Sequence, residues 1–428
     1  MNTTESLLSF IEDATSPFHV VKQSAALLEE AGFSPLAFDE TWSLTPGGKY
    51  YSLVHGTTLF AFNIGAHVGN AYTFRIASAH TDHPCLHIKP IAECTEKDYL
   101  KLNVEVYGGM TKNTWLDRPL SIAGNVALKS EDIFHPKTVL VDFKRPLLTI
   151  PNLAIHMNRE LNKGVELNNQ TDMLPLLGML DETLNKENYF ISLLAEELNV
   201  EKEEILDFDL FIYNTEKGCS LGLKNDFISA PRLDNLTSVL SCITGIQGNV
   251  NPNTVSVIAL FDNEEIGSRS KQGADSIISN LLLEKINQAL GKERNDLYNI
   301  ILKSHMISVD VAHGFHPNYP SKNDPTNVTQ LNKGVSIKLN SNQKYATDSE
   351  AIGAIQQLCH AFKIPYQKFV NRSDIAGGGT LGSISSSWLP MKTVDLGIPL
   401  LAMHSARELM GTQDQNSLNQ LIKAFFSE

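Results

Sequence analysis

The sequence predicts an α/β fold in which a β-rich domain interrupts a larger domain of strands and helices. Strands and helices alternate at the start of the chain and again after Pro231, which is typical of a mixed sheet with helices on both faces. In the middle of the chain, short runs of alternating polar and apolar residues favour antiparallel, half-exposed strands. We therefore expect one α/β domain in two segments, residues 1–90 and 229–428, with an inserted β-rich domain at residues 91–228.

The spacing of apolar residues predicts the individual elements. In the first segment, helices are expected at residues 6–14 and 20–31, and strands at 51–54, 58–64 and 74–78. In the inserted domain, strands are expected at residues 101–107 and 137–142, and two helices within the acidic stretch 185–207. In the last segment, helices are expected at residues 234–245, 276–290, 349–362 and 417–426, and strands at 254–261, 306–310, 335–339 and 367–370.

The composition favours a cytoplasmic protein that binds neither nucleic acid nor a membrane. The chain has 428 residues, a net charge of −13 and a pI of about 5.5, and binding to nucleic-acid phosphates depends on basic residues. No apolar stretch approaches the roughly 20 residues that span a bilayer. The first residues contain acids and lack the basic region of a signal peptide. Five cysteines without CxxC spacing favour a reducing compartment over a disulfide framework or a cysteine-based zinc site.

Acidic residues and histidines stand where apolar runs end, and Asp234 stands at the start of an apolar helix. In chain order they are His80 and Asp82 after residues 74–79, Glu264 and Glu265 after 254–261, Asp310 at the end of 306–310, and His404 at the end of 398–404. In open α/β sheets, ligands bind outside the carboxyl ends of the strands. Four strands that deliver such side chains to one edge therefore predict a site.

The residue types at these strand ends indicate a catalytic metal site, not a structural one. Imidazole and carboxylate without thiolate suit a zinc-type ion that keeps open coordination positions. Two histidines and three carboxylates are too many ligands for one such ion and fit two ions about 3.5–4 Å apart, with Asp234 as the bridging ligand. In the pair Glu264–Glu265, one acid would bind metal and the other would act as general base for an attacking water.

Each residue has a plainer interpretation when it is taken alone. Glu264–Glu265 resembles a solvated acidic turn, and His80 could be a buried histidine of the core. Asp234 could be an ordinary helix N-cap. Asp310 could belong to a histidine-rich loop, and His404 could lie in a buried polar network. The recurrence of these residues at strand ends is what favours a shared site.

A glycine-rich segment, Gly377–Gly382, matches the GxGxxG pattern of dinucleotide-binding proteins. That fingerprint requires an acid about 20 residues further on, at the end of the next strand. Asp395 is closer than that and precedes its apolar run. We therefore interpret the segment as a turn that lets substrate backbone approach the metal edge, and a nicotinamide-dependent oxidoreductase is the weaker alternative.

Taken together, five segments resemble the aspartyl aminopeptidase family of metallopeptidases. They keep the family's order and span almost the whole chain. They are Ala79-His-Thr-Asp-His-Pro-Cys-Leu86, Arg232-Leu-Asp-Asn-Leu236, Phe261-Asp-Asn-Glu-Glu-Ile-Gly-Ser268, Ser308-Val-Asp-Val-Ala-His-Gly-Phe-His-Pro-Asn-Tyr319 and Met403-His-Ser-Ala-Arg-Glu408.

The resemblance implies a role for each residue of the site. It implies that one zinc is held by His80, Asp234 and Asp310, and the other by Asp234, Glu265 and His404. It also implies that Glu264 is the general base and that Asp82 orients His80. His156 matches a histidine that reaches a neighbouring subunit's active site, and Lys338 matches a lysine near the pocket for an acidic side chain.

The expected function is therefore removal of N-terminal residues from peptides by a dinuclear zinc aminopeptidase with a preference for Asp or Glu. Manganese or cobalt could replace zinc at such ligands. The resemblance further implies that the inserted domain dimerises and that dimers assemble into a dodecamer. The alternatives are a related dinuclear hydrolase, either an N-deacylase or a carboxypeptidase, and an assembly protein without catalytic turnover.

Overall fold

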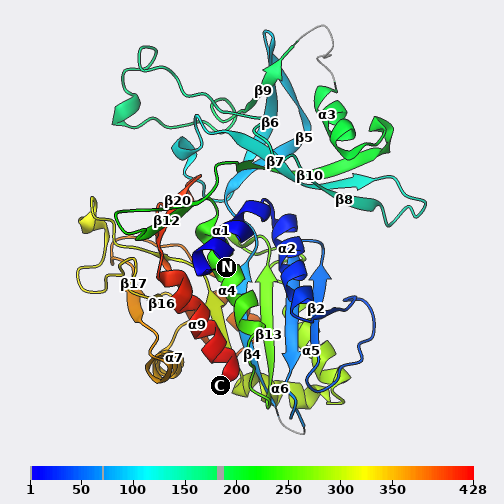
Figure 1. Ribbon diagram of the computed structural model, residues 1–428, viewed down its shortest axis with the longest axis vertical. Coiled ribbons are helices and arrows are strands. Elements are labelled where there is room, and N and C mark those ends of the chain that lie inside the picture. The colour runs from blue at the N-terminus through cyan, green and yellow to red at the C-terminus, as the bar shows by residue number, and fades with distance from the viewer. Residues whose placement is uncertain (1, 70–71, 181–187) are drawn as a thin grey trace. The chain divides into compact units, whose positions relative to one another are not determined.

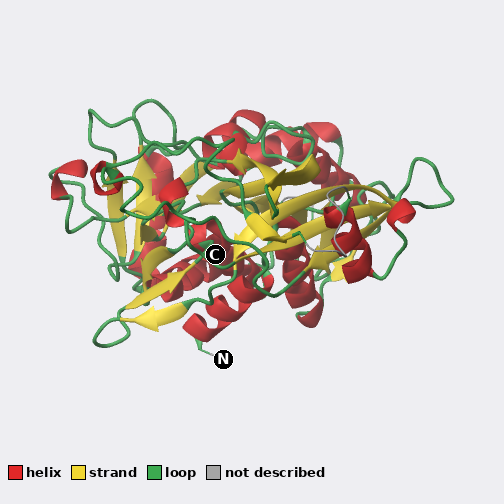
Figure 2. Cartoon of the chain, turned by 90° about the horizontal axis from the view of Figure 1, so that it is seen from above, coloured by secondary structure: helices red, strands yellow, loops and turns green. Residues whose placement is uncertain are grey.

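The computed structural model describes residues 2–69, 72–180 and 188–428, and these form two compact units. Unit 1 comprises residues 1–82, 218–403 and 408–428, and unit 2 comprises residues 83–217 and 404–407. Helices (red in Figure 2) and strands (yellow) both make up large parts of the chain, which confirms the mixed α/β class. The domain limits expected from the sequence stay a prediction.

The largest sheet lies in unit 1 and has nine strands within the described residues. Its order is β1 (Ser34–Pro35), β2 (Lys49–Val54), β3 (Thr58–Ile64), β13 (Thr254–Phe261), β4 (Thr73–His80), β14 (His305–Val309), β18 (Lys392–Gly397), β16 (Val335–Leu339) and β17 (Tyr366–Val370). The four central strands β13, β4, β14 and β18 run parallel, whereas β3 and β16 pair antiparallel with their central neighbours. The parallel centre places four carboxyl ends at one edge of the sheet.

Helices cover both faces of this sheet. The helices of unit 1 are α1 (Thr3–Asp13), α2 (Pro17–Glu30), α4 (Leu233–Ile246), α5 (Ile278–Ala289), α6 (Arg294–Lys303), α7 (Ser349–Phe362), α8 (Leu381–Trp388) and α9 (Asp414–Ser427). Helices α1, α2, α4, α7 and α9 contribute to one apolar cluster with the sheet, and α5, α6 and α8 contribute to the cluster on the opposite face (Figure 1). A sheet buried on both faces explains why β13 reads as one continuous apolar run.

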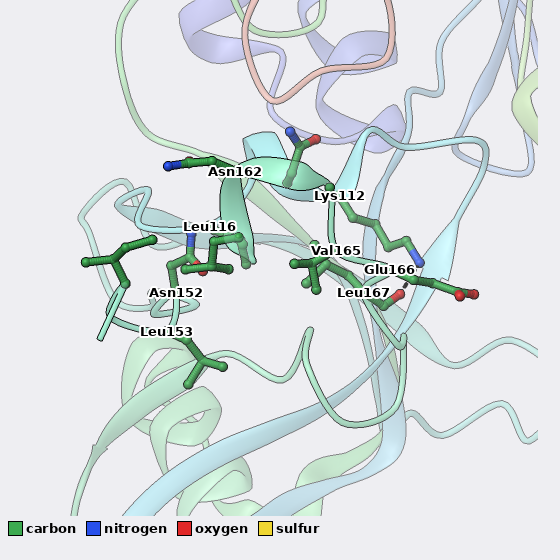
Figure 3. Close-up of a pocket in the computed structure, with 12 residues that line it drawn as sticks. Lys112, Leu116, Asn152, Leu153, Asn162, Val165, Glu166 and Leu167 are labelled. Carbon is green, nitrogen blue, oxygen red and sulfur yellow. Dashed lines mark hydrogen bonds between the residues drawn. The ribbon is translucent and has the colours of Figure 1, made fainter. Parts of the chain in front are cut away.

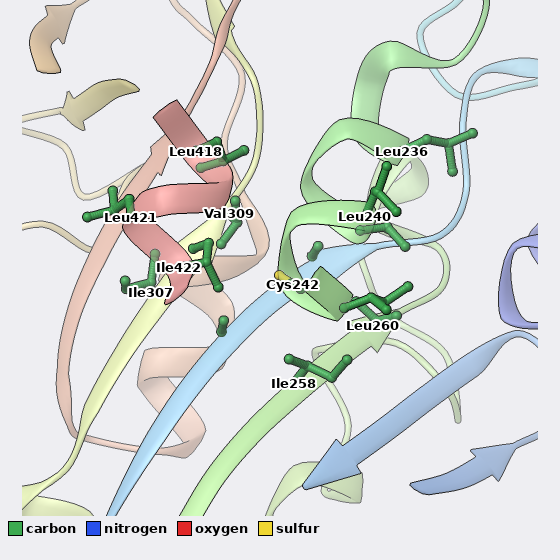
Figure 4. Close-up of a cluster of buried hydrophobic side chains, with 14 of the residues drawn as sticks. Leu236, Leu240, Cys242, Ile258, Leu260, Ile307, Val309, Leu418, Leu421 and Ile422 are labelled. Carbon is green, nitrogen blue, oxygen red and sulfur yellow. The ribbon is translucent and has the colours of Figure 1, made fainter. Parts of the chain in front are cut away.

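The core on the α4 and α9 face consists of aliphatic side chains from helices and strands. Figure 4 shows Leu240 of α4 and Leu421 of α9 with Ile258 of β13 and Ile307 of β14 in this cluster. All four are buried, with at most 6% of the residue surface exposed. The cluster fixes α4 against the sheet, and α4 carries Asp234 in its first turn.

Local signals set the starts of the first helices. Asn2 and Glu5 form a capping box at α1, in which each side chain accepts a hydrogen bond from the other residue's backbone N–H. Pro17 occupies the first turn of α2, where its missing N–H costs no helical hydrogen bond. Both helices therefore begin three residues earlier than the apolar spacing alone predicted.

Unit 2 contains an antiparallel sheet of six strands in its described part. Their order is β8 (Lys137–Asp142), β7 (Leu120–Leu128), β10 (Ile205–Asn214), β5 (Cys85–Glu96), β6 (Tyr99–Tyr107) and β9 (Leu176–Met179). The helix α3 (Tyr189–Leu198) packs against this sheet through Phe190, whose ring contacts Phe208. The predicted β-rich character of this part of the chain is present.

A smaller sheet in unit 1 consists of β11 (Cys219–Leu221), β12 (Phe227–Ala230), β20 (Glu408–Gly411), β19 (Pro399–Leu401) and β15 (Ala312–His313). The apolar run that precedes His404 therefore contributes β19 to this sheet. It does not form a strand of the nine-stranded sheet, because β19 pairs with β15 and β20. The expectation that four strands of one sheet deliver the site residues is wrong on this point.

The acidic stretch 185–207 was also only partly predicted. Residues 185–187 lie outside the described residues, and α3 is the first of the two expected helices. The second is reduced to a single 3₁₀ turn at Lys202–Glu204, and the chain enters β10 at Ile205. The inner residues of β10 pair with β7 and β5, so sheet pairing outweighs the helical propensity of the glutamates before it.

In the described residues, none of the helices combines the length and the apolar character that a membrane span requires.

Leu260→Ala tests the core. Leu260 is fully buried in the α4 and α9 cluster, so its truncation should cost about 2–5 kcal/mol and lower the midpoint of thermal unfolding. The matched control is Leu223→Ala, because Leu223 is 103% exposed and its truncation should change stability by less than about 0.5 kcal/mol. Equal midpoints for the two variants would contradict the assignment of Leu260 to the core.

Candidate metal centre

Three neighbouring strands bring the predicted acids and histidine to the same edge of the nine-stranded sheet. His80 is the last residue of β4 and pairs with Phe261, the last residue of β13. A 3₁₀ turn at Glu264–Ile266 follows β13, and Asp310 directly follows β14. The parallel register of these strands therefore produces the convergence that their apolar runs predicted.

His80 lies at the middle of a buried group of carboxylates. Its Nε2 atom is 3.3 Å from Oδ1 of Asp234 and 3.6 Å from Oδ1 of Asp310. Ligand atoms of His80, Asp234 and Glu265 lie within 4.8 Å of one another. His80 and Asp234 are buried and Glu265 is half-buried, so solvent reaches only a small part of this group.

Asp82 contacts both His80 and the turn that carries Glu264 and Glu265. Its carboxylate oxygens accept hydrogen bonds of 3.1 Å from the backbone N–H groups of Glu264 and Glu265. Its backbone carbonyl lies 3.0 Å from Nδ1 of His80, closer than its carboxylate at 3.4 Å. Because Nδ1 faces these oxygens, Nε2 is directed to Asp234 and Asp310. This geometry is compatible with the predicted role of Asp82 in orienting His80. Through its two hydrogen bonds, Asp82 also fixes the backbone of Glu264 and Glu265.

Asp234 lies inside the first turn of α4 and does not cap the helix. The N-cap residue is Arg232, and Asp234 itself has non-helical backbone angles. Its backbone N–H donates to Oε2 of Glu408 at 3.0 Å, and the side-chain amide of Asn235 donates to the carbonyl of Val309 at 3.0 Å. These contacts join the start of α4 to the end of β14, next to Asp310.

The electrostatics of this group favour a bound cation. Burial alone would lower the pKa of the His80 imidazole, but the carboxylates, above all Asp234 and Asp310, raise that pKa well above its ordinary value. Burial raises the pKa of the Glu264 carboxyl to about 8, opposed by His80 and assisted by repulsion from Asp310. A divalent ion would relieve the same repulsion. The donor set, one imidazole with several carboxylates and no thiolate, fits a zinc-type ion.

Lys338 is fully buried on β16 and faces Asp310. Its ammonium group donates to Oδ2 of Asp310 at 3.2 Å and to the carbonyl of Val311 at 3.1 Å, and it lies 5.1 Å from the ring centre of Tyr345. Burial would raise the pKa of Asp310, but attraction to Lys338 and to His80 lowers it. Lys338 thus holds one oxygen of Asp310, and the other oxygen faces His80.

His404 and His156 belong to unit 2, and their predicted roles stay predictions. His404 places Nδ1 3.1 Å from the carbonyl of Gly109, and its own carbonyl accepts from the N–H of Thr111 at 2.9 Å. His156 is exposed in a loop, next to Met157, which is 76% exposed.

The loop around His156 borders a cavity of about 700 Å³ within unit 2 (Figure 3). Leu153, Ile155, Val165 and Leu167 supply apolar surface, and the ammonium group of Lys112 donates to the carbonyl of Leu167 across the cavity wall. A large cavity with apolar and polar walls is typical of a binding surface.

Two acids near the centre were missed by the sequence reasoning. Asp262 lies between β13 and the Glu264 turn, and burial, with repulsion from Asp82, raises its pKa to about 7. Its place at the end of the β13 run was a usable signal. Glu408 contacts Asp234 from 174 residues away in sequence, and no local pattern predicts that contact.

The glycine-rich segment Gly377–Gly382 has a packing explanation. A Cβ atom at Gly382 would lie 2.5 Å from both carboxylate oxygens of Asp395, so glycine is required by close approach. Asp395 also accepts hydrogen bonds from the hydroxyl of Thr380 at 2.6 Å and from the N–H of Ala346. The acid therefore braces the turn before α8, and the interpretation of this turn as a substrate contact stays a prediction.

Comparison with known families gives one match over nearly the whole chain. The model of the aminopeptidase I zinc metalloprotease family (M18) matches residues 10–426. Among curated relatives, a probable M18 family aminopeptidase 2 from Clostridium novyi is 46% identical over 423 residues, which cover 98% of each chain.

Solved structures with the same fold include Ape4 in its complex with Nbr1, with a TM-score of 0.94 and 35% identity. That match covers 99% of this chain and 85% of Ape4. The mApe1 dodecamer of S. cerevisiae has a TM-score of 0.86 and 27% identity, with 99% of this chain and 96% of that chain covered.

Proposed function

The chain belongs to the aminopeptidase I zinc metalloprotease (M18) family, and from this premise we propose that it is a dinuclear aminopeptidase that prefers N-terminal Asp or Glu. It is a metallo-aminopeptidase, because the family match spans almost the whole chain and its relatives carry that activity in their names. The number of ions, the ligand assignments and the substrate preference are the proposed part.

The observation that carries the proposal is the convergence of His80, Asp234 and Glu265, with ligand atoms within 4.8 Å of one another. Asp310 lies beside this group and is held by Lys338. Mononuclear catalytic zinc sites use three protein ligands, so further carboxylates beside these three support a second ion.

We assign His80, Asp234 and Asp310 to one zinc and Asp234, Glu265 and His404 to the other. Asp234 would bridge the ions, which agrees with its position nearest to His80 Nε2. Manganese or cobalt could take the same places, since imidazole and carboxylate ligands accept several divalent ions. The assignment of His404 rests on its place at the end of an apolar run and on the family resemblance.

Glu264 is proposed as the general base. Zinc held by these residues would supply Lewis acidity, which would acidify a water and polarise the scissile carbonyl. The Glu264 carboxylate would take a proton from the attacking water and return it to the leaving amine of the peptide. Asp82 accepts hydrogen bonds from the backbone N–H groups of Glu264 and Glu265, and it would act as a positioning residue that orients His80.

The acidic preference is assigned to Lys338 and His156. An ammonium group has three donors, and the two described hydrogen bonds of Lys338 use two of them. The third could bind the carboxylate of an N-terminal Asp or Glu. His156 would contribute from a neighbouring subunit, and its exposure is compatible with such a contact.

Assembly into dimers and a dodecamer is proposed by analogy with the mApe1 dodecamer. The dimerisation role of the β-rich part and a cytoplasmic location remain predictions from the sequence. Peptides with a free N-terminus are the proposed partners.

A substrate panel tests the function. Chromogenic amides of Asp and Glu should be hydrolysed faster than those of Leu or Lys, and N-acetylated analogues should resist hydrolysis because their amino group is blocked. A chelator should abolish turnover, and zinc, manganese or cobalt should restore it. Equal rates for all side chains would refute the acidic preference, and cleavage of N-acetylated substrates would indicate a deacylase or a different peptidase.

Glu264→Gln and Glu265→Gln separate the two roles of the pair. Glu264→Gln should keep its metal and lose about 10²–10⁴ in kcat, which is the usual cost of losing a general base. Glu265→Gln should bind less metal, because a ligand is weakened. Metal content by mass spectrometry and kcat under saturating substrate measure the difference. Near-normal kcat in Glu264→Gln would exclude it as the base.

Lys338→Met tests the acidic preference against a structural role. The ratio of kcat/KM for aspartyl over leucyl amides should fall at least about tenfold, since a charge-assisted hydrogen bond is lost. Metal content must be measured in parallel because Lys338 also holds Asp310. The control is Lys368→Met on the adjacent strand, where the side chain is exposed. A proportional loss on both substrates would assign Lys338 to Asp310 alone.

A further inference from the structure

Three basic residues form a row across three adjacent parallel strands at the edge opposite to the metal centre. Arg75 of β4 pairs with His305 of β14, and His305 pairs with Lys392 of β18. Residues paired in register point to the same face of a sheet. Arg75 and Lys392 therefore lie on either side of His305 on the same face of the sheet.

Within the described residues, an acid compensates the charge of Lys392, whereas no carboxylate pairs with Arg75. Lys392 pairs with Glu350, but the described partners of Arg75 are the hydroxyl of Thr73 and Nδ1 of His305, each at 3.3 Å. Because arginine is always a donor, Nδ1 of His305 accepts this hydrogen bond. The neutral imidazole then carries its proton on Nε2, as a further donor.

The pKa values agree with this arrangement. Burial lowers the pKa of His305, and the positive charges of Arg75 and Lys392 lower it further, while Glu350 opposes the shift. Burial also lowers the pKa of Arg75. His305 therefore stays neutral while it lies between two cations.

The row borders a cavity of about 130 Å³ with an apolar wall. Ile355 of α7, Val394 of β18 and Phe425 of α9 supply this wall. Glu428 also lines the cavity, yet within the described residues it forms no ion pair with the row. A cavity of about 150 Å³ holds benzene, so this one suits an aliphatic group of about four carbons beside a small polar head.

We propose that this cavity binds a short branched aliphatic carboxylate, with the carboxylate at Arg75 and His305 and the tail against Ile355, Val394 and Phe425. A carboxylate matches the planar donors of arginine. A divalent anion such as phosphate would use the bases but leave the apolar wall without contact. The site lies at the other end of β4, which ends at His80, and of β14, which precedes Asp310.

Isothermal titration calorimetry with isovalerate and its neutral isostere isovaleramide tests the site. Isovalerate should bind the intact protein with a dissociation constant of about 1 mM, given its small size. Isovaleramide should bind at least about tenfold more weakly, since it cannot form a charge-assisted hydrogen bond. Equal affinities would overturn the proposal.

Two variants locate the binding. Arg75→Gln should weaken isovalerate at least about tenfold, because it removes the bidentate donor. Ala354→Leu, on the cavity wall, should weaken it by filling the space while all three bases remain. The control Arg294→Gln changes an exposed arginine on α6 and should bind as the unaltered protein does. Unchanged affinity for isovalerate in both Arg75→Gln and Ala354→Leu would overturn the proposal. Because the two variants change different parts of the cavity, the test does not depend on the folding of one variant alone.

A carboxylate could also bind the metals, and chelation separates the two sites. Binding that survives metal removal and is lost in Arg75→Gln supports the cavity, whereas binding that disappears with the metal overturns it. N-acetyl-glycyl-leucine distinguishes the sources of the carboxylate. Tighter binding of this peptide than of isovalerate would indicate a peptide C-terminus, and weaker binding would indicate a free short-chain acid; either supports the site if Arg75→Gln abolishes it.

Discussion

The Asp82 carboxylate is the contact on which the geometry of the candidate centre depends. It accepts hydrogen bonds from the backbone of Glu264 and Glu265, and its main-chain carbonyl lies against His80. Hydrogen bonds to a buried carboxylate are stronger than neutral ones. One side chain therefore fixes the relative positions of an imidazole from β4 and two acids that follow β13, which are the elements that any metal chemistry at this edge requires.

The parallel register of β13, β4 and β14 makes this contact possible. Because Phe261 pairs with His80, the chain leaves both strands at the same level, and the turn after β13 falls within reach of Asp82. The helix α4 then adds Asp234 from the covering layer, tied by Asn235 to the end of β14. The centre is thus assembled from strand ends and one helix start, supported by aliphatic cores on both faces of the sheet.

Sequence reasoning found the residues at strand ends because an apolar run followed by an acid is a local signal. It identified His80, Glu264 and Asp310 in this way, and the helices and strands of unit 1 mostly lie where their periodicity indicated. It could not find the hydrogen bond from Glu264 to Asp82, which are 182 positions apart in sequence, or the contact of Glu408 with Asp234. Such contacts depend on strand order, and no single segment encodes it. The strand β10 was missed for the same reason. Its acidic start has no clear strand pattern, and its pairing with β7 and β5 stabilises it as a strand.

Under the proposed function, the buried cation of Lys338 would serve two purposes. Several carboxylates in a buried space repel one another, and an unpaired charge there is costly. Lys338 offsets part of this repulsion by holding the Asp310 oxygen that does not face His80. An ammonium group that is already fixed by two hydrogen bonds loses little further freedom when it binds a third partner. The contact that holds Asp310 therefore also preorganises Lys338, so under the proposed acidic preference a substrate carboxylate would meet a donor in a fixed position.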